Sequence, residues 1–594
     1  MKMRVADYLV GQLYQAGAKH SFLITGGMIM HLTDALLRHK KQKYICCHHE
    51  QAAAMAAEAY GRYTGRLGVA YVTAGPAALN TLTGVVGAYV DRAPCIIVAG
   101  QSKVSQAKVT ETRQFSLQGF NTLPIFRQVT KYAVMLDDIS RVKYEIGKCI
   151  YLAKTSPVGP VWLECPIDIQ GAIFDPDDFE GFHPPQTRGE DTAFEKQVDL
   201  VADAIKCSRR PFFLLGAGVR LAGAVEAASN LISSVNIPVL TSRLGMDLIE
   251  HKHPLFVGRP GTYGDRPANF TVQNADLMIV IGCRLSVGLI GHDYGAFAPL
   301  AKKVVVDIDA KELAKPSVTP DISINADAAQ FIGLLHNKLR GYRSQNDAWV
   351  KQTQYWKDTY PVDLPEYKKE TEGINSYHFM AVFSEAMSKG DLFLVDTGSC
   401  FHVHAQAFKV KRGQRHIITG GLSTMGYMPA SIGVAAAAHG KEVYCITGDG
   451  SVQMNIQELQ TIVHNKLPVK LIILSNNGYL LIRHTQFNFM EGRLIGESPS
   501  TGVSFPDMKK IAKAYGIDYI RIARLSELKN KLEIVKNFKG PLICEVMTPP
   551  NQLLIPRVAS KKLENGSMAS MPYDDMFPFL PRGEYELNRV YNKT

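Results

Sequence analysis

Two polar motifs stand where successive strands of one sheet are expected to end. Asp449 lies in the turn Gly448-Asp449-Gly450-Ser451, after a buried strand expected over 441–447, and Asn476-Asn477 follow the strand expected over 469–474. The carboxyl ends of neighbouring parallel strands meet at one edge of a sheet, where ligands bind. Carboxylate and amide oxygens, together with phosphate oxygens, are the ligands that Mg2+ prefers. The two motifs therefore predict a metal site in which Asp449 is a ligand.

The same turn is suited to a phosphate group. Gly448 and Gly450 allow the backbone to come close to a phosphate, and the helix expected from Met454 presents its N-terminus to negative charge. A Gly-Asp-Gly turn alone is weak evidence, since many such turns are merely tight loops. Its combination with Asn476-Asn477 after the next strand favours a site for a phosphate-bearing ligand with its metal.

Glu50 is a candidate acid-base residue. It stands at the junction between a strand expected over 44–47 and an Ala-rich helix expected over 52–62. A helix N-terminus stabilises the carboxylate, whereas an apolar pocket raises its pKa, and this competition can place a general acid-base group near the working pH. From the spacing alone, an ordinary glutamate in the first turn of a helix is the simpler interpretation.

The elements that must position these residues follow the pattern of parallel sheets. Short β-branched or apolar runs bounded by glycine, such as 68–73, 95–99, 277–281 and 443–447, alternate with helical patterns. The predicted fold class is therefore α/β, with doubly wound parallel sheets from end to end.

The chain divides into several segments. At 594 residues it is too long for one core, and polar, Pro-rich stretches at 175–188 and 341–371 indicate boundaries. The predicted domains are 1–180, 190–340 and 370–550, followed by a C-terminal arm, 551–594, that is expected to pack on the body.

Composition limits the classes of function. The 66 Lys and Arg against 55 Asp and Glu give a net charge of +11, but the basic residues are dispersed, so a solvated surface is favoured over a nucleic-acid interface. The ten cysteines form no C-x-x-C pair, no signal-peptide core begins the chain, and no apolar run reaches about 18 residues. We expect a cytoplasmic protein without membrane or nucleic-acid partners.

The stretch from Gly448 to Gln460, Gly-Asp-Gly-Ser-Val-Gln-Met-Asn-Ile-Gln-Glu-Leu-Gln, together with Asn476-Asn477, resembles thiamine-diphosphate enzymes and specifically acetolactate synthase catalytic subunits. The resemblance covers essentially residues 1–550. It extends to His49-Glu50-Gln51-Ala52-Ala53, Thr73-Ala74-Gly75-Pro76, Leu117-Gln118-Gly119 and Gly421-Leu422-Ser423-Thr424-Met425-Gly426-Tyr427. The resemblance implies a pyrimidine-binding domain, a central flavin-type domain and a diphosphate-binding domain, in that order.

The resemblance also implies individual roles. Asp449, Asn477 and the backbone carbonyl of Tyr479 would bind Mg2+. Glu50 would activate the cofactor, Gln118 would be an active-site glutamine, and Met425 would hold the cofactor in its bent form. The remaining residues implied in thiamine diphosphate binding are Gly26, Gly27, Thr73, Asn80, Gly398, Ser399, Thr424, Gly448, Gly450 and Ser451. The loop Thr397-Gly398-Ser399-Cys400 departs from the V-G-Q-H that the family commonly carries there.

The middle segment carries a weak dinucleotide motif. Gly216-Ala217-Gly218 follows a strand, but Leu221 stands where G-x-G-x-x-G has its third glycine. The segment nevertheless resembles the flavin-binding domain of acetolactate synthases, which implies FAD. The residues implied are Gly216, Gly218, Arg284, Asp307, Asp309 and Asp327, and Arg284 could instead grip the anionic group of an acceptor substrate.

The resemblance favours a carboligase that decarboxylates pyruvate and transfers the two-carbon unit to a ketone acceptor. Thr485 replaces the tryptophan that shapes the acceptor pocket in the family, so a larger or more polar acceptor is expected to contact Thr485. The motifs at 24–28, 46–51 and 574–579 resemble members of bacterial surface-polysaccharide pathways, so a nucleotide-linked keto sugar is an alternative acceptor.

Other functions stay open from the sequence. A flavin-linked pyruvate oxidase and a simple 2-oxo acid decarboxylase are alternatives, whereas a non-catalytic scaffold is disfavoured because Glu50, Asp449 and Asn477 are all intact. The family builds its active site between two subunits, so the resemblance implies a homodimer or homotetramer.

Overall fold

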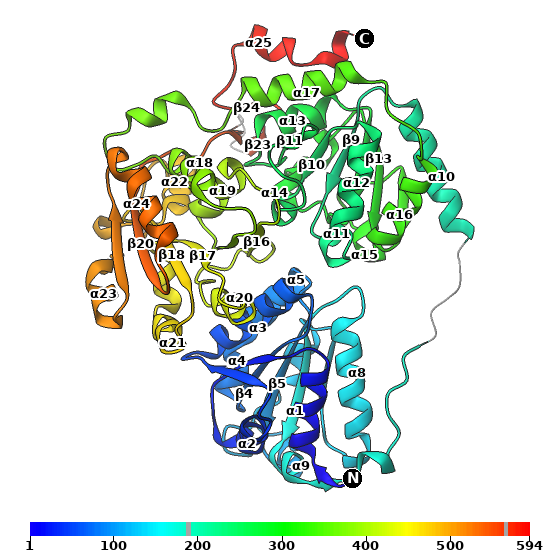
Figure 1. Cartoon of the computed structure of the whole chain (residues 1–594), viewed down its shortest axis with the longest axis vertical. Coiled ribbons are helices and arrows are strands. Elements are labelled where there is room, and N and C mark those ends of the chain that lie inside the picture. The colour runs from blue at the N-terminus through cyan, green and yellow to red at the C-terminus, as the bar shows by residue number, and fades with distance from the viewer. Residues whose placement is uncertain (186–191, 563–567, 594) are drawn as a thin grey trace.

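The body of the protein consists of three six-stranded parallel sheets, and helices cover each of them (Figure 1). The computed structural model describes residues 1–185, 192–562 and 568–593. The prediction of an α/β chain with three doubly wound sheet domains is confirmed. The predicted boundary near residue 190 lies outside the described residues.

The first sheet belongs to the N-terminal part of the chain and has the strand order β3-β2-β4-β5-β7-β6. Its strands are β2 (His20–Leu23), β3 (Lys43–Cys46), β4 (Gly68–Val72), β5 (Cys95–Gln101), β6 (Tyr132–Met135) and β7 (Val161–Pro166). Its helices include α1 (Val5–Gln15), α2 (Met30–Arg38), α3 (Glu50–Thr64), α4 (Pro76–Asn80), α5 (Leu82–Val90), α7 (Leu123–Arg127), α8 (Val142–Lys154) and α9 (Ile167–Gly171).

The second sheet has the order β11-β10-β9-β12-β13-β14. Its strands are β9 (Pro211–Leu215), β10 (Val239–Thr241), β11 (Phe256–Gly258), β12 (Leu277–Ile281), β13 (Lys302–Asp307) and β14 (Ile322–Asn325). Its helices include α10 (Thr192–Cys207), α11 (Gly218–Leu221), α12 (Val225–Val235), α13 (Arg266–Asn274), α14 (Val287–Ile290), α15 (Ala310–Leu313), α16 (Ala328–Lys338) and α17 (Asp347–Thr359).

The third sheet has the order β16-β15-β17-β18-β20-β19. Its strands are β15 (Leu392–Val395), β16 (Arg415–Ile418), β17 (Val443–Gly448), β18 (Val469–Ser475), β19 (Asp518–Ile522) and β20 (Leu542–Met547). Its helices include α18 (Ser376–Ala386), α19 (Ser399–Ala407), α20 (Ala430–Ala437), α21 (Glu458–His464), α22 (Leu480–Phe489), α23 (Met508–Tyr515) and α24 (Leu525–Asn537). β15, β17 and β18 are neighbours, so their carboxyl ends lie side by side.

The first and third domains share one apolar core. Alanines of α3 and α20 belong to the same buried cluster, and the two helices meet at the centre of the molecule (Figure 1). A Cβ added to Gly433 would come 1.9 Å from the carbonyl oxygen of Ala56, so only glycine permits this close approach. Small side chains thus bring α3, which begins at Glu50, directly against the third domain.

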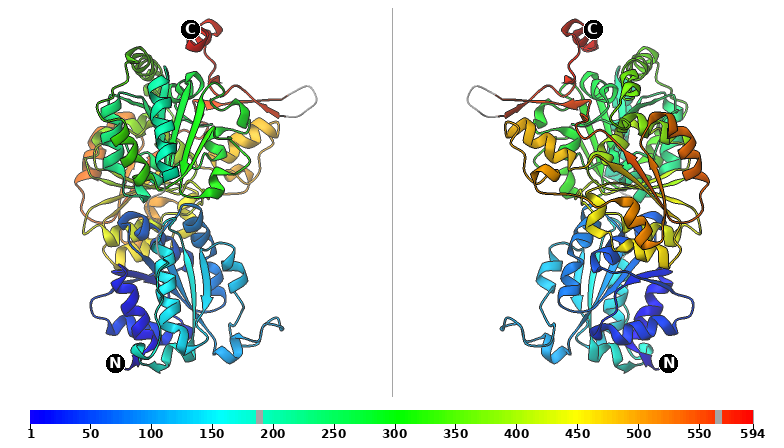
Figure 2. Two further views of the ribbon diagram at one scale, coloured as in Figure 1. Left: turned by 90° about the vertical axis from the view of Figure 1, so that its right-hand side faces the viewer. Right: turned by 90° about the vertical axis from the view of Figure 1, so that its left-hand side faces the viewer.

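The C-terminal arm packs against the middle domain, and the two termini lie at opposite ends of the molecule (Figure 2). Arg266 donates to the carbonyl oxygen of Pro578 (2.7 Å), and the indole N–H of Trp356 donates to Asn588 (2.8 Å). No helix among the described residues is long and apolar enough to cross a membrane.

Candidate active site

Asp449 directly follows β17, as the sequence predicts, and the backbone holds its carboxylate in place. Oδ1 accepts the amide N–H of Gly450 (2.9 Å), while Oδ2 accepts those of Asn476 (3.0 Å) and Asn477 (2.7 Å). A carboxylate has about four lone-pair positions, so Oδ1 keeps capacity for one further partner such as a metal ion. The two predicted motifs therefore lie in direct contact at one edge of the sheet.

The residues after β18 complete a set of oxygen donors. Asn477 has an exposed side chain and a left-handed backbone (φ +55°), and the Oδ1 atom of Asn476 is buried without a hydrogen-bond partner. The carbonyl oxygen of Tyr479 accepts the amide of Arg483 (3.0 Å), which leaves it a second lone pair. Carboxylate, amide and carbonyl oxygens fit a hard cation such as Mg2+.

Burial raises the pKa of Asp449 to about 6, although the backbone hydrogen bonds oppose that rise. Below this pH the metal-free protein carries a neutral carboxyl that binds Mg2+ poorly. We expect the Kd for Mg2+, measured by calorimetry with the phosphate ligand present, to increase as the pH falls from 7.5 through 6. Asp449→Asn should bind Mg2+ weakly at every pH in this range; a wild-type Kd that stays constant from pH 7.5 to 6 would refute the assignment.

Gly450 lies flush against the ring of Tyr479. A Cβ at this position would come 2.3 Å from Cε1 of the ring, which itself packs edge-on against Phe505. Gly450→Ala is expected to displace the ring and weaken binding of the phosphate ligand roughly ten-fold, or about 1.4 kcal/mol. Gly333→Ala is the control, because a Cβ on Gly333 meets nothing within 4 Å. Equal affinities for the two variants in a binding titration would contradict this role.

Asp396 belongs to the same edge, and the sequence interpretation missed it. It follows β15, and its carboxylate accepts the hydroxyls of Ser451 (2.7 Å) and Thr447 (2.9 Å) and the amide of Tyr427 (3.2 Å). Burial raises its pKa to about 6, against these hydrogen bonds. Ser451 also accepts the amide of Gly426 (2.8 Å). Asp396 thereby links the Asp449 turn to the segment that carries Met425.

Glu50 lies at the predicted junction of strand and helix, and it is the first residue of α3, which begins two residues earlier than predicted. Its Oε2 atom accepts the side-chain amide of Asn80 (2.9 Å). His49 caps the helix by accepting the amide of Gln51 (3.1 Å), a structural role. On both sides of Glu50 the chain contacts the third domain: His48 donates its amide to Glu458 (2.9 Å).

Gln51, which follows Glu50, completes this contact, because its side chain accepts from Asn455 (3.0 Å). Asn455 also donates to the carbonyl oxygen of Gly426 (2.6 Å), next to Met425. Glu50 and Met425 thus both lie at the seam between the first and third domains. A Cβ on Gly426 would come 2.7 Å from Met454, so this turn requires its glycine (φ +77°).

The other residues predicted on the first domain form a second group. The Thr73 hydroxyl accepts the amide of Met28 (3.2 Å), and a Cβ on Gly26 would come 2.5 Å from the Thr73 side chain. Gln118 is exposed with φ +56°, and a Cβ on Gly75 would come 2.5 Å from its carbonyl oxygen. Gly75 and Gln118 are therefore neighbours, and their link to Asp449 stays a prediction.

A cavity of about 860 Å3 lies where the three domains meet. It is lined by the end of α5 and the residues after it (89–92), by the carboxyl ends of β9, β12 and β13, and by residues 397, 401–402, 420–421 and 423 of the third domain. This volume is within the range of cofactor and substrate sites. Five of the residues predicted to bind a flavin line it: Gly218, Arg284, Asp307, Asp309 and Asp327.

Several of these residues have structural partners. Asp309 caps α15 by accepting the amide of Lys311 (3.0 Å) and also pairs with Arg92 of the first domain, and Asp327 caps α16. A Cβ on Gly216 would come 2.1 Å from the carbonyl oxygen of Gly282, so that glycine serves close packing of two strand ends. Asp307 likewise accepts the amide of Asp309 (2.9 Å), so Arg284 is the residue of the set best placed to contact a ligand.

Thr485 does not line this cavity. Its side chain is exposed on α22, and its hydroxyl donates to the carbonyl oxygen of Leu481 (2.9 Å), which does line the cavity. The predicted contact of Thr485 with an acceptor therefore stays a prediction.

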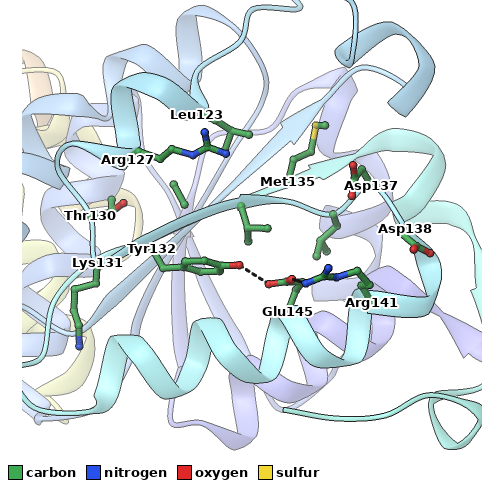
Figure 3. Close-up of a pocket in the computed structure, with 13 residues that line it drawn as sticks. Leu123, Arg127, Thr130, Lys131, Tyr132, Met135, Asp137, Asp138, Arg141 and Glu145 are labelled. Carbon is green, nitrogen blue, oxygen red and sulfur yellow. Dashed lines mark hydrogen bonds and ion pairs between the residues drawn. The ribbon is translucent and has the colours of Figure 1, made fainter. Parts of the chain in front are cut away.

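A second cavity, of about 570 Å3, lies beside the edge strand β6 (Figure 3). Much of its polar lining is paired within the domain. The Tyr132 hydroxyl donates to Glu145 (2.7 Å), Arg141 pairs with Glu145 (2.5 Å), and Lys131 donates to the carbonyl oxygen of Thr155 (2.8 Å). The predicted site residues lie elsewhere.

Comparison with known proteins gives family matches to three segments of the chain. Residues 3–123 match the N-terminal TPP binding domain of thiamine pyrophosphate enzymes, residues 198–335 their central domain and residues 396–546 their C-terminal TPP binding domain. The three matched segments contain, respectively, Glu50, Arg284 and Asp449.

Several curated proteins are similar over almost their full length. The acetolactate synthase large subunit of Cyanidium caldarium is 30% identical over 93% of this chain and 94% of its own. The probable acetolactate synthase large subunit of Methanocaldococcus jannaschii is 31% identical over 93% of both chains. The acetolactate synthase isozyme 1 large subunit of Escherichia coli is 29% identical over 93% of this chain and 95% of its own.

Proposed function

The chain belongs to the thiamine pyrophosphate enzyme family, with acetolactate synthase large subunits as relatives, and from this premise we propose a specific reaction. The protein decarboxylates pyruvate and transfers the two-carbon unit to a ketone acceptor, using thiamine diphosphate, Mg2+ and FAD. The observation that carries this proposal is the Asp449 carboxylate, held by the amides of Gly450, Asn476 and Asn477 beside further oxygen donors.

The chain's own residues divide the work. Asp449, Asn477 and the carbonyl of Tyr479 hold Mg2+, and the Gly450-Ser451 turn receives the diphosphate. When bound, thiamine diphosphate supplies the electron sink that decarboxylation of a 2-oxo acid requires. The remaining thiamine ligands are those that the resemblance implies, with Gly398, Ser399 and Thr424 on the third domain.

Glu50 holds and releases the proton that activates the cofactor. Asn80 fixes the orientation of its carboxylate, and the half-buried Glu50 lies beside the contact between the first and third domains. Gln118 and Met425 orient the reacting groups. Orientation by itself raises the reaction rate, so neither residue needs to transfer a proton. These roles rest on the family resemblance together with the position of Glu50 at the seam.

The cavity between the three domains is the proposed site for FAD and the acceptor. Arg284 faces it and supplies a permanent positive charge for a phosphate or carboxylate group. We also expect a homodimer or homotetramer in the cytoplasm; all ten cysteines are free thiols, as suits a reducing compartment.

Product analysis tests the reaction. The purified protein is incubated with 13C-labelled pyruvate, thiamine diphosphate, Mg2+ and FAD, alone and with a panel of 2-oxo acids and nucleotide-linked keto sugars. A product with two labelled carbons attached to one acceptor class is expected, and the acceptor follows from its mass. Labelled acetaldehyde or acetate alone would instead identify a decarboxylase or an oxidase.

A further inference from the structure

The segment 418–427, which carries Met425, is tied to the first domain by buried side chains of α3. The hydroxyl of Tyr427 donates to Oε2 of Glu58. Arg62, one turn along α3, donates to the carbonyl oxygen of Ile418 (3.1 Å). Both ends of the segment are therefore fixed by one helix of the other domain.

The middle of the segment meets the first domain as well. A Cβ built on Gly421 would come 2.3 Å from Oδ1 of Asp91 and 2.4 Å from Val90, so the backbone lies directly against the end of α5. Arg62 bridges the acidic residues, at 3.0 Å from Glu58 and 3.6 Å from Asp91. Glu58, Arg62 and Asp91 thus form one cluster beneath the segment.

This cluster is buried at the domain seam. The side chains of Glu58 and Asp91 are 3% and 4% exposed, and that of Arg62 is 12% exposed. Burial raises the pKa of Glu58 and of Asp91, while the Arg62 guanidinium counteracts both shifts. A buried network of this kind keeps one arrangement, because breaking any bond leaves an unpaired polar group out of water.

On its other side, the segment contacts the phosphate-binding edge. The amide of Tyr427 donates to Asp396 (3.2 Å), and the amide of Gly426 donates to Ser451 (2.8 Å). Tyr427 therefore has hydrogen-bond partners in both domains: Asp396 accepts from its backbone amide, and its hydroxyl donates to Glu58 and accepts from Arg62 (3.4 Å).

We propose that Glu58, Arg62, Asp91 and Tyr427 are positioning residues, which couple the first domain to the segment 418–427 and thereby hold Met425 in place at the active site. This proposal rests on the proposed function, since the role of Met425 belongs to it. Glu58, Arg62 and Tyr427 do not line the cavity between the three domains and act through the segment, whereas Asp91 also lies on the wall of that cavity.

Tyr427→Phe removes the hydroxyl and keeps the ring. Misplacement of Met425 is expected to lower kcat about 30-fold, because small displacements of positioning groups have effects of this order. The KM for pyruvate should change by less than about two-fold, since the donor's ground-state contacts are untouched. Tyr132→Phe is the matched control: it removes a tyrosine–glutamate hydrogen bond that lies within the first domain, on the edge strand β6 (Figure 3).

Hydrogen–deuterium exchange gives a readout that does not depend on catalysis. In the protein without cofactor, peptides covering 418–427 should exchange faster in Tyr427→Phe than in the wild type or Tyr132→Phe, because the segment opens locally. The double variant Glu58→Gln/Tyr427→Phe should lose no more kcat than the more impaired single variant, as expected of residues that share one bond.

The proposal is overturned if Tyr427→Phe keeps the exchange pattern of the wild type, if Tyr132→Phe shows the same loss of kcat, or if the two single losses add in the double variant. A failure of the proposed function looks different. In that case the wild type would release no CO2 from pyruvate, while exchange of 418–427 would still respond to Tyr427→Phe.

Discussion

Glu50→Gln is expected to lower kcat for pyruvate decarboxylation by about 10³-fold, within the range attributed to general acid-base groups. The amide has the shape of the carboxylate and can still accept the hydrogen bond from Asn80, which is 2.9 Å from Oε2. Because its shape is kept, the variant should fold and bind its cofactor. Because the amide cannot exchange a proton, the variant should lose the chemical step. The measurements are CO2 release under saturating cofactors and the Kd for thiamine diphosphate by calorimetry.

Glu226→Gln is the matched control for this variant, because Glu226 is an exposed glutamate in the first turn of α12, in the middle domain. It should keep the kcat of the wild type. If Glu50→Gln decarboxylates pyruvate at the same rate as the control, Glu50 is an ordinary first-turn glutamate and the mechanism proposed above is wrong.

Asp449→Asn is expected to weaken binding of thiamine diphosphate about 100-fold and to remove its dependence on Mg2+, because an amide oxygen is a much poorer ligand than a carboxylate. Asparagine keeps one oxygen, which can accept the amides of Asn476 and Asn477 and leaves only that of Gly450 unpaired, whereas Asp449→Ala leaves all three without an acceptor. Each buried amide left unpaired costs about 1–3 kcal/mol of stability, so asparagine is the cleaner change.

Asp507→Asn provides the comparison for Asp449→Asn. Asp507 also accepts backbone amides in the third domain, those of Lys509 (2.8 Å) and Lys510 (3.2 Å), and it lies at the start of α23. Calorimetric titrations with and without Mg2+ should separate the two variants. Retention of Mg2+-dependent binding in Asp449→Asn would remove Asp449 from the metal site.

The contact between Asp449 and Asn476-Asn477 could be predicted because it depends on consecutive strands. Both motifs follow buried, β-branched runs, and successive strands of a parallel sheet commonly lie side by side. The contact of Asp396 with the Asp449 turn depends on strands that are not consecutive in the chain. β16 lies between β15 and β17 in the sequence, yet β15 and β17 are neighbours in the sheet. An aspartate after a strand is common, so only the assembled sheet identifies it as part of the site.

The cluster at the domain seam shows the same limit. Glu58 and Tyr427 are 369 residues apart in the chain, and no local pattern relates them. Packing of α3 on α20, which Gly433 permits, brings them together. Their contact is a property of the domain arrangement and not of either segment.

The sequence predicted only part of what single polar side chains do in the structure. Asp309 and Asp327, expected as flavin ligands, also cap helices, a role that an aspartate just before a helix commonly has. Thr485 was expected at the acceptor and has an exposed side chain. The packing of α22 decides which of its faces points inward. Because α22 is short and mixes polar with apolar residues, its sequence alone does not identify that face.

Cofactor dependence of CO2 release from pyruvate tests the central claim most directly. Purified protein, freed of cofactors by dialysis against a chelator, is assayed with thiamine diphosphate alone, with Mg2+ alone and with both. Release of CO2 that appears only with both, and that disappears in Glu50→Gln, is the result predicted. Absence of CO2 release with both present, or equal release without thiamine diphosphate, would contradict the assignment.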